Sequence, residues 1–247
     1  MKINGSAAKT SFFYKKKKEC SPNWKLIYKC KCASTEYELD KYLKYNNLRN
    51  IPIAIFSRSQ SSGFGRNNRE WSAPVGGIWL SAAYPIKSKK FNPEIFSISI
   101  AYKLCEMLSK ESIKVNLKWP NDIFYGSKKL IGFLPKVITR GDQVNYVRVG
   151  LGMNLKNKSP FQGISLSKII NKKNLCESYW SSKILHSINE AIYINNNRDL
   201  IIRGANNFLN KTKLPKEYVH QKWIINNIDS RGGLVISKDK NQKIINM

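Results

Sequence analysis

Acidic side chains are scarce in this chain: 16 aspartates and glutamates stand against 43 lysines and arginines among its 247 residues. The resulting net charge of +27 favours a polyanionic partner such as a nucleic acid. Much of the excess is lysine, however, and it accompanies abundant asparagine and isoleucine. All three have AT-rich codons, so a genome bias predicts the same surface. The run Lys15–Lys18 is interpreted as a solvated tail or loop, and charge alone supports nucleic-acid binding only weakly.

Histidine and regularly spaced cysteine are also scarce. The five cysteines are scattered and odd in number, and the chain has two histidines. Cys30 and Cys32 lie closer together than the cysteines of the usual C-x-x-C zinc knuckle. We therefore expect reduced, structural thiols, with no metal-ligand set and no bound metal cluster.

Long apolar runs are missing as well, since none approaches the ~20 residues that a membrane-spanning helix needs. No membrane partner is therefore expected. Residues Met1–Lys18 are basic and lack the continuous apolar core of a secretory signal. A cytoplasmic location is the default prediction. An organelle-targeting leader is the weaker alternative, because the segment is basic and contains hydroxyl residues.

The hydrophobic content of 42% is typical of a globular protein, and a chain of this length can bury a substantial core. Residues 1–25 are predicted to be irregular. Helices are predicted over 36–48, with Ser34 or Thr35 as N-cap, over 93–110 and over 177–196. Strands are predicted over 51–56, 77–83, 114–119, 122–125, 129–138 and 143–154, and in the last thirty residues around a turn at 230–233. This order indicates an α+β fold with a central mixed or antiparallel sheet backed by helices.

The segment Lys118-Trp119-Pro120-Asn121-Asp122 and the following Lys128–Gly132 combine a rigid turn, a carboxylate, an amide and a positioned ammonium. Such a set is equipped to hold a carboxylate against a nucleotide phosphate. Upstream, loop 60–71 carries Gly63 and Gly65 together with Arg66 and Arg69. Glycine lets backbone N–H groups face an anion, and arginine adds charge-assisted hydrogen bonds. Taken singly, each feature is equally typical of an ordinary turn, and the combination favours an anion site.

The stretch 147–154 alternates across a strand, so that Arg148, Gly150, Gly152 and Asn154 share one face. Glycine weakens a strand unless a ligand or another backbone must come close. The two glycines predict either a floor for a flat or slender ligand or a place where a helix packs on the sheet. The segment alone leaves both open. Trp71 similarly suits either stacking on a purine or a place in the core.

The order of these motifs resembles the biotin protein ligases over roughly residues 30–155. The resemblance is carried by Ser34-Thr35, Gln60, the loop Gly63–Trp71, Ala73-Pro74, the KWPND run at 118–122, Lys129–Gly132 and Gly150–Asn154. It implies a class II synthetase-like fold with a reduced, SH3-like β segment at the C-terminus. The implied units are a basic, irregular segment over 1–29, a catalytic biotin- and ATP-binding domain over 30–212 and a truncated β domain over 213–247. No helix-turn-helix-sized region precedes residue 30, so the N-terminal DNA-binding domain of some relatives is expected to be missing, with no specific DNA partner.

The resemblance also implies the reaction. Biotin and Mg²⁺·ATP are the expected substrates, biotinyl-5′-AMP is the intermediate, and a lysine of the biotin carboxyl carrier protein of acetyl-CoA carboxylase is the acceptor. The enzyme is expected to be a monomer or a homodimer. Lys129, Arg66 and Asp122 are the implied catalytic residues. The implied biotin-binding residues are Ser34, Thr35, Glu36, Gln60, Gly63, Phe64, Gly65, Arg66, Lys129, Gly132, Gly150 and Gly152. The implied ATP-binding residues are Arg66, Arg69, Trp71, Asn121, Lys129 and Asn154.

The chain departs from the family pattern at several positions. Glu36 stands where asparagine is usual and Phe64 where arginine is common, Asn67-Asn68 replace Arg-Gly, and Pro135-Lys136 replace a hydrophobic-Glu pair. The core of the site is retained, so an active enzyme is expected. The alternatives are a lipoate-type ligase or transferase of the same fold, a relative that binds biotin without transferring it, and a basic nucleic-acid-binding protein.

Overall fold

The computed structural model describes residues 6–16, 22–46, 50–171, 175–219 and 222–247. Its main sheet has seven strands: β1 (Lys25–Lys29), β2 (Ile53–Ser57), β3 (Ile78–Pro85), β4 (Asn116–Lys118), β5 (Asp122–Tyr125), β6 (Lys128–Arg140) and β7 (Gln143–Met153). They lie in the order β1-β2-β3-β7-β6-β5-β4. Only the β1–β2 pair is parallel among these pairings, so the sheet is mixed, as predicted.

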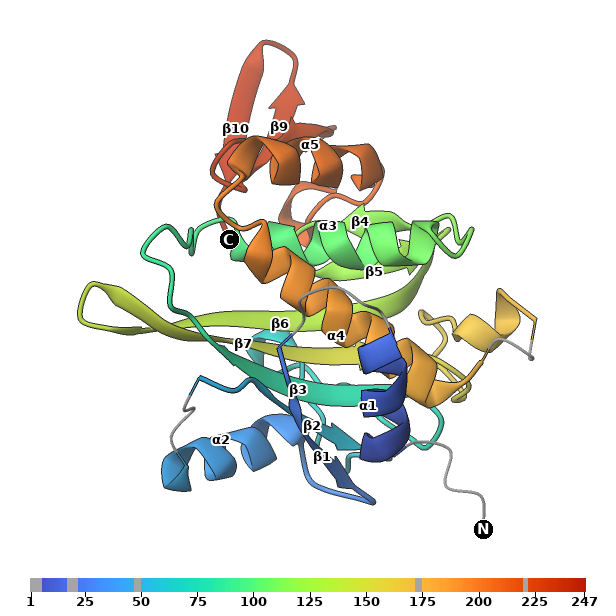
Figure 1. Ribbon diagram of the computed structural model, residues 1–247. Coiled ribbons are helices and arrows are strands. Elements are labelled where there is room, and N and C mark those ends of the chain that lie inside the picture. The colour runs from blue at the N-terminus through green and yellow to red at the C-terminus, as the bar shows by residue number, and fades with distance from the viewer. Residues whose placement is uncertain (1–5, 17–21, 47–49, 172–174, 220–221) are drawn as a thin grey trace.

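Helices cover both faces of this sheet (Figure 1). The larger core lies on the side of α3 (Phe96–Ser109) and α4 (Glu177–Tyr193), where inward strand residues such as Val149 and Leu151 are buried. Helix α2 (Thr35–Tyr45) packs on β2 and β3 from the other side, over a small cluster around Leu39. The face shared by α2 and the two glycines of β7 is where a ligand floor can lie.

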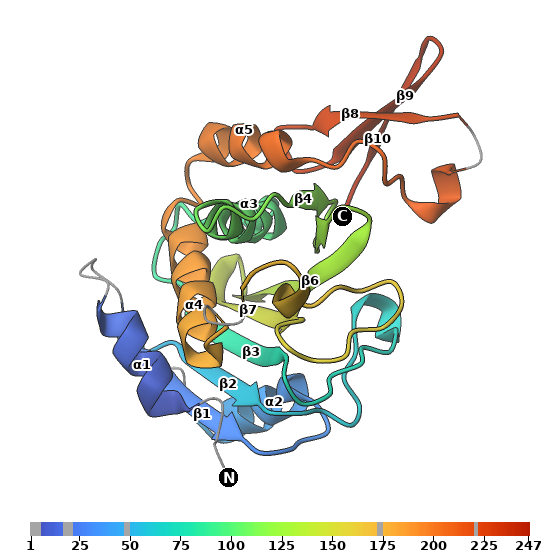
Figure 2. The ribbon, with the colours of Figure 1, turned by 90° about the vertical axis from the view of Figure 1, so that its right-hand side faces the viewer.

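A separate three-stranded antiparallel sheet follows helix α5 (Arg198–Phe208). Its strands are β8 (Ile224–Ile228), β9 (Leu234–Lys238) and β10 (Asn241–Ile245), in the order β10-β9-β8. Figure 2 shows this sheet beyond α5 and α3, at the far end of the molecule from α1 and β1. The indole of Trp119 donates to the carbonyl of Gly232 at 2.9 Å, which ties the KWPND turn to this sheet.

The N-terminal segment differs from the prediction of an irregular stretch. Residues Ala7–Lys16 form helix α1, which packs on α4, and Lys25–Lys29 form an edge strand of the main sheet. The ring of Tyr14 stacks on His186 of α4 at 4.1 Å between centroids. Tertiary contacts therefore stabilise a segment whose sequence carries no strong helix signal. Parts of the predicted irregular stretch, 1–5 and 17–21, lie outside the described residues.

Two further helix predictions need correction. The helix expected from residue 93 begins at Phe96, and Asn92 instead accepts a hydrogen bond from the N–H of Glu94 at 3.2 Å within the preceding turn. Helix α5 was not predicted. A signal for it is present in Asn197, whose side chain caps α5 by accepting from the N–H of Leu200 at 3.1 Å. The other two predicted helices are present: the one over 177–196 is α4, and the one after Ser34 or Thr35 is capped by Ser34, whose hydroxyl accepts from the N–H of Glu36.

Candidate active site

The glycines of β6 and β7 form a flat floor on the face of α2. Gly132 pairs with Gly152 across the two strands, and Gly150 is two residues further along β7. The indole of Trp71 lies on this floor. A Cβ added at Gly152 would stand 2.6 Å from the Trp71 ring, and one at Gly132 would stand 2.9 Å from it. Gly132 and Gly152 are therefore required by an aromatic ring that approaches the sheet, whereas a Cβ at Gly150 would stand 3.0 Å from the carboxylate of Glu36 on helix α2.

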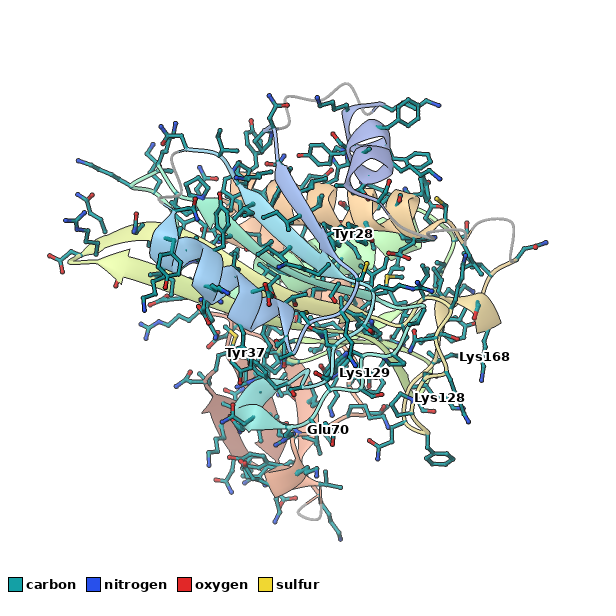
Figure 3. The ribbon with its side chains drawn as sticks, turned by 90° about the horizontal axis from the view of Figure 1, so that it is seen from below. Tyr28, Tyr37, Glu70, Lys128, Lys129 and Lys168 are labelled. Carbon is teal, nitrogen blue, oxygen red and sulfur yellow. The ribbon has the colours of Figure 1, made fainter. Side chains whose placement is uncertain are left out.

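Lys129 stands at one end of this floor. Its ammonium lies 2.6 Å from Asp122 Oδ1 and 4.7 Å from the centroid of the Trp71 ring. The hairpin of β5 and β6 creates this pair, because Asp122, the last residue of KWPND, begins β5 and Lys129 lies on the adjacent strand β6. Figure 3 shows Lys129 among the loops at this end of the sheet. A partly buried ammonium held by a single carboxylate can exchange that partner for a substrate anion.

Asparagine side chains fix the surroundings of Lys129. The amide of Asn154 is buried, donates weakly to the carbonyl of Lys129 at 3.4 Å, and accepts from Asn157 at 2.8 Å. The amide of Asn121 donates to the carbonyl of Phe133 at 2.7 Å and lies 3.5 Å from an Nη1 atom of Arg66. Asn154 thus holds the backbone of Lys129 in place, and its contact with adenine stays a prediction.

Loop 60–71 closes over the floor. The N–H of Trp71 donates to the carbonyl of Gly63 at 2.9 Å, and a Cβ at Gly63 would stand 2.6 Å from the Trp71 carbonyl. Arg66 and Arg69 are both exposed, and Phe64 contacts the ring of Tyr37 at 5.4 Å between centroids. The loop therefore brings its aromatic residue onto the floor while its guanidiniums face solvent.

Polar groups gather at the opposite end of the floor, beside the start of α2. The side-chain oxygen of Gln60 accepts from the N–H of Thr35 at 2.6 Å and from its hydroxyl at 3.0 Å. Ser81 of β3 donates to the same hydroxyl at 2.9 Å. The sequence predicted Thr35 and Gln60 here, while Ser81 was missed because its strand reads as an ordinary buried strand.

Glu36 faces Gly150 from the first turn of α2. One carboxylate oxygen, Oε2, lies 3.0 Å from Nη2 of Arg148 and 3.6 Å from the ammonium of Lys136. The other nitrogen, Nη1 of Arg148, pairs with Asp40. Burial lowers the pKa of the Arg148 guanidinium, but the charges of Glu36 and Asp40 outweigh it and raise the pKa overall. Arg148 is thus a partner of the site that the motif reading did not identify.

Lys118 adds a second ammonium near Asp122. Partial burial lowers the pKa of Lys118, and the charge of Lys129 lowers it further while Asp122 acts in the opposite direction. Lys118 is the cross-strand neighbour of Asp122, and Lys129 forms the ion pair with this carboxylate. Such a cluster carries excess positive charge, which favours an anionic ligand at this end of the floor.

A cavity of about 760 Å³ lies beside Arg66 and Asn121. It is bounded by loop residues 64–68, by β6 at Leu134–Val137, and by Arg231 and Gly233 of the small sheet. Its volume lies within the range of small-molecule sites. Lys136, which contacts Glu36, also lines the cavity, so the cavity borders the Glu36 side of the site and can hold part of a small ligand.

Other expectations concern metals, thiols and membranes. No group of three potential metal-ligating side chains occurs within the described ranges. Cys30, Cys32, Cys105 and Cys176 are free thiols, and Cys20 lies outside those ranges. No helix in the described part of the chain is long and apolar enough to cross a membrane.

Comparison with curated proteins relates the chain to protein ligases. The bifunctional ligase/repressor BirA of Bacillus spizizenii is 29% identical over 136 residues, which are 54% of this chain and 41% of that protein. The human biotin–protein ligase is 24% identical over 143 residues, covering 55% of this chain and 20% of that protein. The chain thus spans about two fifths of the length of the BirA relative.

Comparison with solved structures supports the fold. The biotin protein ligase of Aquifex aeolicus in complex with biotin and ATP has a TM-score of 0.68 and 21% identity, covering 90% of this chain and 95% of that one. The biotin protein ligase of Leishmania major in complex with biotinyl-5-AMP has a TM-score of 0.55 and 19% identity, covering 92% and 100%. The predicted α+β fold of this type is confirmed. A family model described as the biotin/lipoate A/B protein ligase family matches residues 30–154, just over half of the sequence, and the chain belongs to that family.

Proposed function

We propose that the chain is a biotin protein ligase, which activates biotin with ATP and transfers it to a lysine of a biotin carboxyl carrier protein. The observation that carries the proposal is the glycine floor with a polar cluster at one end and the Lys129–Asp122 pair at the other. This arrangement suits an elongated molecule with a polar head and an anionic tail, and biotin has that form.

In the first step, a carboxylate oxygen of biotin attacks the α-phosphorus of Mg·ATP, and the bond to the β-phosphate breaks to release pyrophosphate. Both reactants are anions, so their approach requires nearby cations. Lys129 and Lys118 lie within the same cluster, and exposed Arg66 borders the adjoining cavity. Lys129 releases Asp122 and neutralises the carboxylate and the α-phosphate, while Asp122 remains placed to orient Mg²⁺ of the substrate.

In the second step, the amine of the carrier lysine attacks the acyl carbon of biotinyl-5′-AMP. The amide bond forms, AMP leaves with the electrons of the anhydride bond, and the amine loses a proton. Water must be kept from the reactive anhydride. Trp71 is carried by loop 60–71, and when a ligand displaces its indole from the glycine floor the ring supplies a large apolar cover for it. A cytoplasmic location, a carrier from acetyl-CoA carboxylase and a monomeric or dimeric state belong to the same proposal.

Lys129→Ala tests the first step through biotin-dependent exchange of labelled pyrophosphate into ATP. We expect a loss of at least tenfold, about 1.4 kcal/mol of transition-state stabilisation, because the anionic reactants lose their nearest cation. Lys128→Ala is the matched control, since this neighbouring lysine is exposed and makes the same change of charge. Equal exchange in the wild type and Lys129→Ala would remove Lys129 from this role, and absence of exchange in the wild type would refute the proposal.

A further inference from the structure

Phe161 is an aromatic side chain that the fold holds in solvent. It is 94% exposed and lies on the turn 160–163, which is closed by a hydrogen bond of 2.8 Å from the N–H of Gly163 to the carbonyl of Pro160. Single apolar side chains on a surface are common and by themselves indicate nothing. The exposure of Phe161 is informative because of where its turn is attached and which charges surround it.

Backbone hydrogen bonds attach this turn to the strand of Lys129. The N–H of Lys129 donates to the carbonyl of Gln162 at 2.9 Å, and the N–H of Ile164 donates to the carbonyl of Lys129 at 2.9 Å. At the other end of the loop, the buried side chain of Asn157 accepts from the N–H of Leu155 at 3.1 Å. Both ends are thus fixed next to the candidate active site, so a partner that binds the turn has little of the loop to order.

Acidic side chains are rare in the part of the sequence around this turn. Between Asp122 and Glu177 the chain has one acidic residue, Asp142. Asp142 lies in the β6–β7 turn, at the end of these strands away from Lys129. Asp122 is paired with Lys129, and Glu177 is buried and bonded to Tyr28. The described residues of this stretch therefore place no free carboxylate near the turn.

Two exposed lysines flank the turn. Lys158 precedes it, and Lys168 ends the short 3-10 helix η2 (Leu166–Lys168) that follows it. Figure 3 shows Lys168 on the same side of the molecule as Lys129. We call Lys158, Phe161 and Lys168 the Phe161 face. An aromatic anchor bordered by cations fits a protein surface that has an apolar pocket bordered by carboxylates. A single-stranded nucleic acid stacks on several aromatic rings, and this face has one.

We propose that the Phe161 face docks the acceptor protein whose lysine receives biotin. This inference rests on the proposed function and adds the surface that the macromolecular substrate uses. The acceptor amine must reach an acyl carbon held beside Lys129, and the turn of Phe161 is hydrogen-bonded to the backbone of Lys129. A carrier surface with carboxylates around an apolar pocket therefore contacts the face while its lysine enters the site. The face acts in the transfer step, and the adenylation step does not need it.

The two half-reactions separate this role from a role in the active site. Adenylation is measured by biotin-dependent pyrophosphate exchange without carrier, and transfer by labelling of a carrier domain at varied carrier concentration. Phe161→Ala should raise the carrier KM about tenfold, because aromatic anchors dominate binding at interfaces, and should leave exchange within about twofold of the wild type. Tyr193→Ala is the matched control, since this ring is 84% exposed at the opposite end of α4 from Glu177, and it should change neither value.

Charge reversal tests the lysines of the face. The double variant Lys158→Glu/Lys168→Glu should lower kcat/KM for the carrier about tenfold at low salt, and the loss should shrink at about 0.5 M salt because exposed charges are screened. Lys240→Glu, in the exposed β9–β10 turn, makes the same type of charge change and should keep wild-type transfer. Hydroxylamine, a small nucleophile that needs no docking surface, should capture biotin from the adenylate equally in all variants.

An unchanged carrier KM in Phe161→Ala overturns the inference, and unchanged transfer in the double lysine variant overturns the role of the lysines. A parallel loss of pyrophosphate exchange or of hydroxylamine capture in Phe161→Ala also overturns the inference, because it places Phe161 in the nucleotide site. If Phe161→Ala weakens binding of single-stranded DNA and keeps the wild-type carrier KM, the face serves nucleic acid instead. A wild type that neither exchanges pyrophosphate nor labels the carrier fails the proposed function itself, which is a distinct result.

Discussion

At the scale of single residues, the floor depends on glycines, which have no side chain. Gly132 and Gly152 let the Trp71 indole lie on the sheet, and Gly150 leaves room for the carboxylate of Glu36. Trp71 Nε1 is buried and contacts no acceptor among the described residues. The ring is therefore placed by packing and by the Lys129 ammonium above it, and it can shift when a ligand occupies the floor.

Gly152→Ala tests this dependence. The added methyl group would stand 2.6 Å from the indole, so Trp71 must leave its place. We expect at least a tenfold loss of biotin affinity, measured by calorimetry, with an unfolding temperature lowered by a few degrees. Gly141→Asn at the tip of the β6–β7 hairpin is the control, because its positive φ of 59° suits asparagine and nothing lies nearby. Undiminished affinity in Gly152→Ala would show that the ligand does not use this floor.

At the scale of elements, the sequence was sufficient to predict a helix start or a turn where a side chain bonds to the backbone within a few residues. The cap at Ser34, the β6–β7 hairpin and the turn before β9 were predictable from sequence because Ser, Gly and Asp act within a few residues. Helix α1 was not, since its place depends on the contact between Tyr14 and His186, 172 residues apart. The motif residues Lys129 and Asp122 were predicted, but the pairing of Arg148 with Glu36 was not. That pairing joins α2 to β7, and no local pattern encodes it.

The contact of β1 with α4 predicts a pH effect. The hydroxyl of Tyr28 donates to the carboxylate of Glu177. Burial nevertheless raises the pKa of Glu177, against the opposing effects of this bond and of Lys156 and Arg58. The folded protein thus binds this proton more tightly than the unfolded chain does. Protonation of Glu177 therefore stabilises the folded state. This stabilisation is fully present below the pKa of the unfolded chain and is lost as the pH rises through the pKa of the folded protein.

Glu177→Gln should therefore raise the unfolding temperature at about pH 7, by roughly 2–4 °C if the ionised form costs about 1 kcal/mol. The difference from the wild type should close below about pH 4, where the carboxyl is protonated in both states. Thermal melts across this range measure it. A difference that is constant with pH, or a less stable variant at pH 7, would contradict the explanation.

At the scale of the whole molecule, the charge of +27 is a property of the surface. It predicts that duplex DNA binds at low salt and that the association constant falls linearly on a log–log plot with salt concentration. Scrambling the DNA sequence should change the affinity less than twofold in fluorescence anisotropy. Biotin-dependent pyrophosphate exchange should be unaffected by saturating DNA. Marked sequence preference, or binding that resists salt, would instead favour a dedicated nucleic-acid function.

Biotin transfer is the most direct test of the central claim. Purified protein is incubated with labelled biotin, Mg²⁺, ATP and a biotin carboxyl carrier domain, and the products are identified by mass spectrometry. The account predicts one labelled lysine on the carrier, formed only with ATP and accompanied by AMP and pyrophosphate. If neither labelled carrier nor biotinyl-5′-AMP forms while an established biotin ligase labels the same carrier, the account is contradicted.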